Sequence, residues 1–126
     1  MKRALLFCLC ALFGRPLLAA DDPLAFASGS WFDPDRNGEG FVVQVLRERQ
    51  AIVTWFTYPP AGEEGGQAWM IGTGAATGDR IVIDNMVRPA GAVFGPDFDP
   101  SDVAREPWGS LEIVFEDCDR AAASWN

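Results

Sequence analysis

Apolar and polar residues alternate along much of this 126-residue chain. In 41–46, every second residue from Phe41 is apolar and would lie on one face of an extended segment. In 51–58, Val53 and Trp55 share one face in the same way. A period of two predicts half-buried β-strands, and the polar stretch 47–50 between the two segments predicts an antiparallel hairpin.

The same alternation, interrupted by turns rich in glycine and proline, predicts further strands. They are expected at 29–32, 68–71, 80–84, 108–115 and 121–125. No stretch beyond the N-terminal segment combines a 3.6-residue period with helix caps. The expected fold is therefore all-β, an antiparallel meander that is barrel-like or sandwich-like.

Two regions depart from this regular pattern. The segment 88–107 is rich in glycine, proline and aspartate, which predicts a long irregular loop that Phe94 and Phe98 could pin to the body. The strand expected at 121–125 has no strand after it, so we expect an open sheet edge lacking a closing C-terminal strand.

The first residues have the pattern of an export signal. Lys2 and Arg3 precede ten apolar residues, 4–13, which are too few to span a bilayer core of roughly 30 Å. Small residues up to Ala20 offer a cleavage site. The expected organisation is a signal peptide at 1–20, an N-terminal lead at 21–27 and one β domain at 28–126, in a secreted or periplasmic protein.

Cleavage would leave an acidic protein. Seven arginines and no lysine would face 18 acidic residues, a net charge of −11. Nucleic acid is then a poor partner, as is a membrane surface once the signal is removed. Cys118 would be the one remaining cysteine, since Cys8 and Cys10 lie within the signal. It could be a small buried side chain, it could pair with another chain, or its partner could lie beyond Asn126, so self-association stays open.

Several motifs together resemble a family of secreted bacterial all-β domains that has no characterised function. The motifs lie at 29–34 (GSWFDP), 38–41 (GEGF), 55–58 (WFTY), 67–69 (QAW), 94–100 (FGPDFDP) and 107–111 (PWGSL). The resemblance implies export and an all-β fold, but no catalytic residues. Family members continue with a Gly/Ser-rich turn and one more strand. A weaker similarity to lipocalin- and avidin-like barrels rests on Gly29-Ser30-Trp31 and implies an interior pocket.

Catalytic chemistry has few candidate residues. The chain contains no histidine, which removes the commonest general base and every Ser-His-Asp or Cys-His arrangement. A pair of carboxylates such as Glu39 and Asp84 could serve hydrolysis only if the fold brought the two together. The sequence predicts that the protein is not an enzyme.

The sequence gives only weak indications of a metal site. Asp33, Asp35 and Asn37 match the first half of an EF-hand calcium loop, but its twelfth position is Gln44 rather than a glutamate. A second acidic group lies within 97–102, where Asp-Pro turns are common. We predict no metal and no other cofactor.

Five tryptophans are the remaining signal. They either fill the core of a small β domain or form a stacking surface for a ligand. The predicted ligand-binding residues are Trp55, Trp69 and Trp31. The predicted function is a non-enzymatic module that binds a glycan or a small apolar ligand. The alternative is a structural or interaction protein that associates through an open sheet edge.

Overall fold

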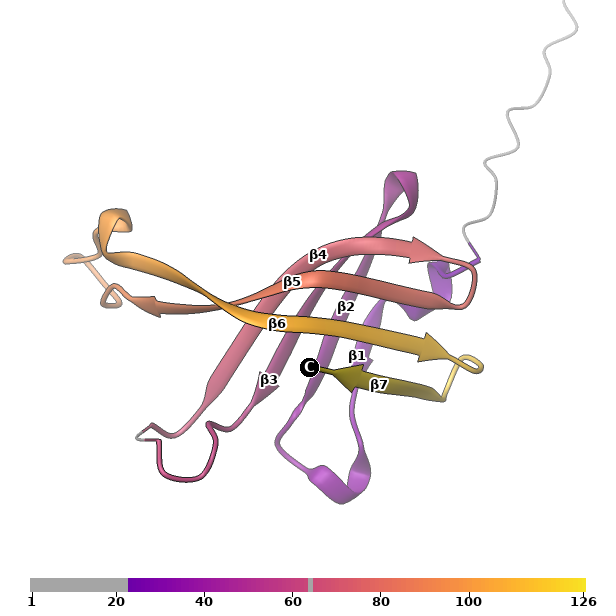
Figure 1. Ribbon diagram of the computed structural model, residues 1–126, viewed down its shortest axis with the longest axis horizontal. Coiled ribbons are helices and arrows are strands. Elements are labelled where there is room, and N and C mark those ends of the chain that lie inside the picture. Colours follow the sequence, from indigo (N-terminus) through magenta and orange to yellow (C-terminus); the bar gives the residue numbers. More distant parts are fainter. Residues whose placement is uncertain (1–22, 64) are drawn as a thin grey trace, which may run out of the picture.

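A computed structural model of the chain describes residues 23–63 and 65–126. The expected signal peptide at 1–20 and the start of the lead lie outside the described residues. Seven strands form a single sheet in the order β1 to β7, and every neighbouring pair is antiparallel (Figure 1). This confirms the all-β meander. The strands are β1 (Gly29–Trp31), β2 (Gly40–Leu46), β3 (Gln50–Thr57), β4 (Ala68–Thr77), β5 (Arg80–Gly91), β6 (Val103–Phe115) and β7 (Ala121–Trp125).

The sheet curls into an open half-barrel whose edge strands, β1 and β7, lie 8 Å apart (Figure 1). The concave face carries the core, and most of it is built from alternate residues of the expected strands; Met86 is an exception, because a register shift separates it from Ile83. The core includes Val43, Val53, Trp55, Met70, Ile81, Ile83, Met86, Leu111, Ile113 and Phe115. No residue with a polar or charged side chain is buried among the described residues. The half-barrel therefore rests on apolar burial.

Four short 3₁₀ turns complete the structure: η1 (Ala25–Ala27), η2 (Pro34–Arg36), η3 (Arg47–Arg49) and η4 (Pro100–Asp102). None of the helices in the described part of the chain is long and apolar enough to cross a membrane. Leu24 and Ala27 are almost fully buried and belong to the core cluster. The end of the expected lead is thus a part of the folded domain.

The expected irregular loop at 88–107 is wrong in its extent. β5 runs to Gly91 and β6 starts at Val103, so the irregular part is 92–102. Beyond Val87, which pairs with Ile71 of β4, β5 continues with β6 as its one partner strand within the described residues. A proline can stand in such a strand because its missing N–H can face the open side. The result is a two-stranded arm that projects from the sheet (Figure 1).

The tip of this arm does not return to the body. Phe94 is fully exposed and Phe98 is about half exposed, so neither pins the loop as expected. The backbone of the tip is instead fixed locally. The Phe98 amide donates to the Gly95 carbonyl, and the Asp102 amide donates to the Asp99 carbonyl. Side chains of the tip therefore point into solvent while its turns are ordered.

The pairing of β4 with β5 contains a register shift between Ile71 and Ala75. Gly72 and Gly74 lie at this point. A side chain on Gly74 would collide with the Val82 carbonyl, and one on Gly72 would press on Ile83. Glycine lets the two backbones approach here, and such irregular points increase the curvature of a sheet.

Candidate ligand-binding cavity

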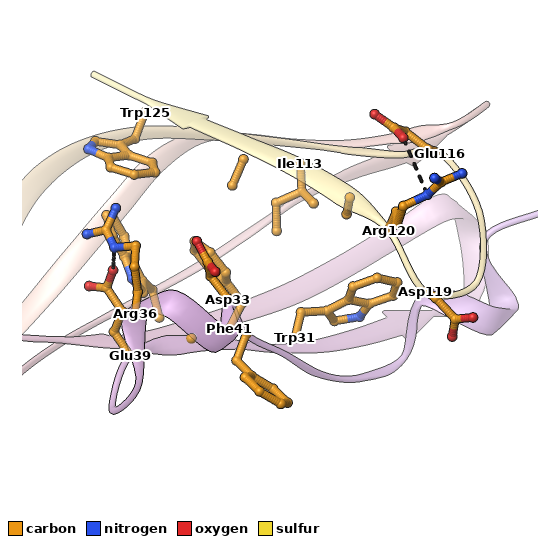
Figure 2. A pocket seen from close by; sticks show the side chains of 15 residues that line it. Trp31, Asp33, Arg36, Glu39, Phe41, Ile113, Glu116, Asp119, Arg120 and Trp125 are labelled. Carbon is orange, nitrogen blue, oxygen red and sulfur yellow. Dashed lines mark ion pairs between the residues drawn. The ribbon is translucent and has the colours of Figure 1, made fainter.

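A cavity of about 490 Å³ lies in the opening between the two edges of the half-barrel. Its walls come from β1, β2 and β3 on one side and from β6 and β7 on the other. Aromatic rings make up much of the wall, and charged side chains stand around it (Figure 2). The aromatic members are Trp31, Phe32, Phe41, Trp55 and Trp125, and the charged members are Asp33, Arg36, Glu39, Glu116, Asp119 and Arg120.

Trp55 is the centre of the aromatic group. Its ring centroid is 5.2 Å from that of Phe41, 5.2 Å from that of Trp108 and 4.7 Å from that of Trp125. The Trp55 side chain is only 5% exposed. Trp55 therefore forms the floor of the cavity, and a ligand would contact mainly the rings in front of it.

Trp31, on β1, forms another part of the wall. Its indole Nε1 donates a hydrogen bond of 2.8 Å to the Ala27 carbonyl, and its ring packs edge-on against Phe115 with centroids 5.0 Å apart. These contacts fix the ring, because both the polar and the apolar part of the indole have a partner. Trp31 thus presents a rigid surface next to the opening.

One end of the cavity carries an ion pair between Arg36 and Glu39 (Figure 2). The Thr57 hydroxyl also donates to the Glu39 carboxylate, at 2.5 Å. Arg36 closes η2, which begins because the Asp33 side chain accepts the amide of Asp35. The local Asp-Pro turn is therefore what brings the guanidinium to the cavity.

The other end carries the turn between β6 and β7. Arg120 pairs with Asp117 at 2.7 Å and approaches Glu116 at 3.8 Å. Hydrogen bonds from the Asp119 amide and from the Arg120 side chain hold the pKa of Asp117 below its ordinary value. Asp119 lies at the same end (Figure 2). Within the described part of the chain, no ion pair includes Asp33 or Asp119.

The predicted ligand-binding tryptophans fall into two places. Trp31 and Trp55 both line this cavity. Trp69 lies on the outer face of the sheet, opposite Phe56 in register, and both side chains are about half exposed there. Trp125 also lines the cavity but was not among the predicted ligand-binding residues, although the alternation in 121–125 places it on one face with Ala121 and Ala123.

The two candidate carboxylates are not brought together. Glu39 lines the main cavity, whereas Asp84 is exposed on β5 next to a register shift. Asp84 lines a different hollow with Ser110 and Ser124. These two groups therefore do not form one acid–base pair.

The aspartates of the two acidic turns accept hydrogen bonds from residues of the same turn. The Asp33 carboxylate accepts the Asp35 amide at 2.9 Å, and the Asp99 carboxylate accepts the Ser101 amide at 2.8 Å and the Ser101 hydroxyl at 2.7 Å. Across residues 23–63 and 65–126, no group of three or more Cys, Asp or Glu side chains is placed to hold a metal ion. Each of the two motifs acts as a turn cap in the structure.

Comparison with models of protein families, with curated proteins and with solved structures finds no match for this chain. The fold is therefore assigned from its own strand order.

Proposed function

We propose that this protein is an exported, non-enzymatic binding module that holds a small ligand in the cavity between β1 and β7. A sugar ring is the ligand class that the cavity favours. The observation that carries the proposal is a cavity of about 490 Å³ with several aromatic rings in its wall. Binding sites for small molecules commonly have roughly 300–1,000 Å³ and combine apolar walls with a few polar groups.

The chemistry of the wall suits a sugar better than a purely apolar molecule. The rings of Trp31 and Trp125 can pack against the C–H face of a pyranose. Around them, the carboxylates of Asp33 and Glu39 can accept hydrogen bonds from hydroxyl groups, and Arg36 can donate to them. A hydrocarbon ligand would exclude water from the Asp33 carboxylate, which has no ion-pair partner among the described residues, and would offer it no hydrogen bond in return.

A binding role is favoured over hydrolysis by the state of the carboxylates. The Glu39 carboxylate is engaged by the Arg36 guanidinium and accepts a hydrogen bond from the Thr57 hydroxyl, so its oxygens already have partners within the protein. Its candidate partner Asp84 lines a different hollow. Glycoside cleavage by two carboxyl groups needs them roughly 5–10 Å apart on either side of the sugar, an arrangement that Glu39 and Asp84 do not form because they line different hollows.

Export is part of the proposal and rests on the N-terminal sequence. The basic and apolar segments before Ala20 have the order of a cleavable signal. The resemblance of the motifs to secreted bacterial all-β domains supports the same location. The acidic surface of the remaining chain is suited to neutral ligands such as sugars, because it repels polyanions.

Calorimetric titration against a panel of mono- and oligosaccharides tests the proposal. Trp125→Ala removes a cavity ring that is 45% exposed, and Trp69→Ala removes a ring that is 43% exposed on the outer face, which makes the two a matched pair. We expect Trp125→Ala to weaken binding about tenfold or more and Trp69→Ala to leave it unchanged. Equal losses in both variants, or no heat with any sugar, would reject the proposal.

A second candidate function is association with another polypeptide through the open sheet edge. The 8 Å separation of β1 and β7 favours it, because neighbouring strands in a sheet lie only about 4.7–4.9 Å apart. Both edges therefore keep backbone groups for a further partner.

A further inference from the structure

We propose that the opening between β1 and β7 accepts one extended, basic peptide segment from a partner polypeptide as an eighth strand. This inference rests on the second function proposed above. The two edges are 8 Å apart, whereas one strand between them needs about 9.6 Å, twice the usual spacing. An outward movement of less than about 2 Å would admit a strand, and direct pairing of the edges would need a larger movement inward.

Strand direction gives the second argument. All six neighbouring pairs are antiparallel, so β1 and β7, the first and seventh strands, run parallel to each other. Closing the barrel directly would create one parallel pair in an otherwise antiparallel sheet. A single inserted strand can run antiparallel to both edges and complete an eight-stranded barrel, in which no edge remains.

The backbone of β7 is oriented for this pairing. Ser110 and Asn126 exchange two hydrogen bonds, and Glu116 donates to Arg120. Because bonded and non-bonded pairs alternate in an antiparallel ladder, the N–H and C=O groups of Ala121, Ala123 and Trp125 point away from β6, toward the opening. Ala121 and Ala123 also line the cavity, and their small side chains leave room for those of an inserted strand.

The charges at the opening specify the chemistry of the occupant. Arg36 and Arg120 are both engaged in ion pairs. Asp33 and Asp119 line the cavity toward opposite ends of it, and neither has an ion-pair partner among the described residues (Figure 2). A segment with a lysine or arginine at each end and small apolar residues facing inward complements this arrangement.

A second copy of this chain fits less well. A strand of a folded copy carries its own neighbouring strand with it, and an opening of 8 Å has room for one strand only. The acidic surface would also repel a second copy. A free segment brings no neighbouring strand with it, so it fits the opening better than a folded copy does, and backbone pairing would hold it there.

Fluorescence anisotropy with a labelled seven-residue peptide of alternating valine and threonine, with lysine at both ends, tests the inference. Two further peptides carry N-methyl groups on the odd or on the even residues, so that each blocks the N–H groups facing one edge. All samples carry Cys118→Ser. We expect the plain peptide to bind at micromolar to millimolar concentration, and each methylated peptide to bind about tenfold more weakly or worse.

Ala123→Pro removes one N–H at the open edge without touching the bonds to β6, and Ala123→Ser is its control. We expect weaker peptide binding in the first variant only. No peptide binding, equal binding of either methylated peptide, or concentration-dependent dimers in light scattering would overturn the inference. If Ala123→Pro does not fold, the binding of the two methylated peptides to the protein with Ala123 retained tests the inference. Loss of peptide binding with sugar binding kept would leave the first proposed function standing.

Discussion

The rings of Trp55 and Trp125 meet with their centroids 4.7 Å apart, although one belongs to the third strand and the other to the last. The contact crosses the inside of the half-barrel, so it exists only because the sheet is curled. It joins the floor of the candidate cavity to the strand that borders its opening. The aromatic core and the candidate site therefore share one group of rings.

Trp55→Ala should strongly destabilise the protein. Trp55 is almost fully buried and packs against three other rings, and truncation of a buried aromatic residue to alanine typically costs about 3–5 kcal/mol of unfolding free energy. Urea unfolding measures the change. Trp69→Ala, on the outer face, should cost about 1 kcal/mol or less. Similar costs in the two variants would show that Trp55 is not part of the core.

Much of the strand pattern could be predicted because it depends on local alternation. Ile81, Ile83, Leu111 and Ile113 are buried as the sequence indicated, since a period of two is a property of the strand itself. The strands of the arm are longer than predicted. Proline at 89 favours a loop unless one edge of the strand is unpaired, and the local sequence does not show that β5 has such an edge.

The composition of the site was harder to predict. Trp31 and Trp69 look alike in the sequence, but one lines the cavity and the other faces outward. The difference depends on which face of each strand becomes concave. The register shift beside Gly72 and Gly74 helps to set that curvature, and its effect on residues of other strands cannot be read from local spacing.

Gly74→Ala should destabilise the pairing of β4 with β5. The added methyl group would collide with the backbone carbonyl of Val82, which cannot move without breaking strand contacts. Overpacking of this kind costs about 1–3 kcal/mol. Gly66→Ala is the control, because no atom lies within 4 Å of that new methyl group. Thermal unfolding of both variants measures the effect. Equal melting temperatures would mean that the backbone of β4 and β5 adjusts to the added methyl group without loss of stability.

Ser101→Ala should raise the pKa of Asp99. Hydrogen bonds from the Ser101 hydroxyl and then from its amide hold the pKa of Asp99 below its ordinary value of 3.8. A carboxyl group whose pKa is lower when folded stabilises the fold above pH 3.8, and this contribution is lost as the pH falls through the folded value. The arm tip should therefore loosen at a higher pH in the variant.

An NMR titration of the aspartate carboxyl carbons measures this shift. Asp117 is the internal control, because its lowered pKa depends on Asp119 and Arg120 instead. An unchanged Asp99 titration in Ser101→Ala would show that the hydroxyl does not contact the carboxylate in solution.

Cys118 should form disulfide-linked dimers slowly, at a rate that increases with salt. Its thiol is exposed in the turn between β6 and β7, so Cys118 is not a small buried side chain, and it has no disulfide partner among the described residues. Asp117 and Asp119 flank it directly, so two such turns repel each other when they approach. Salt screens this repulsion over a Debye length of about 8 Å at physiological ionic strength, which should speed the encounter. Non-reducing electrophoresis over time, at low and high salt, measures the rate.

Cys118→Ser should remain monomeric in light scattering under both conditions. Dimers that persist in that variant would mean that the chains associate through their open sheet edges rather than through the thiol.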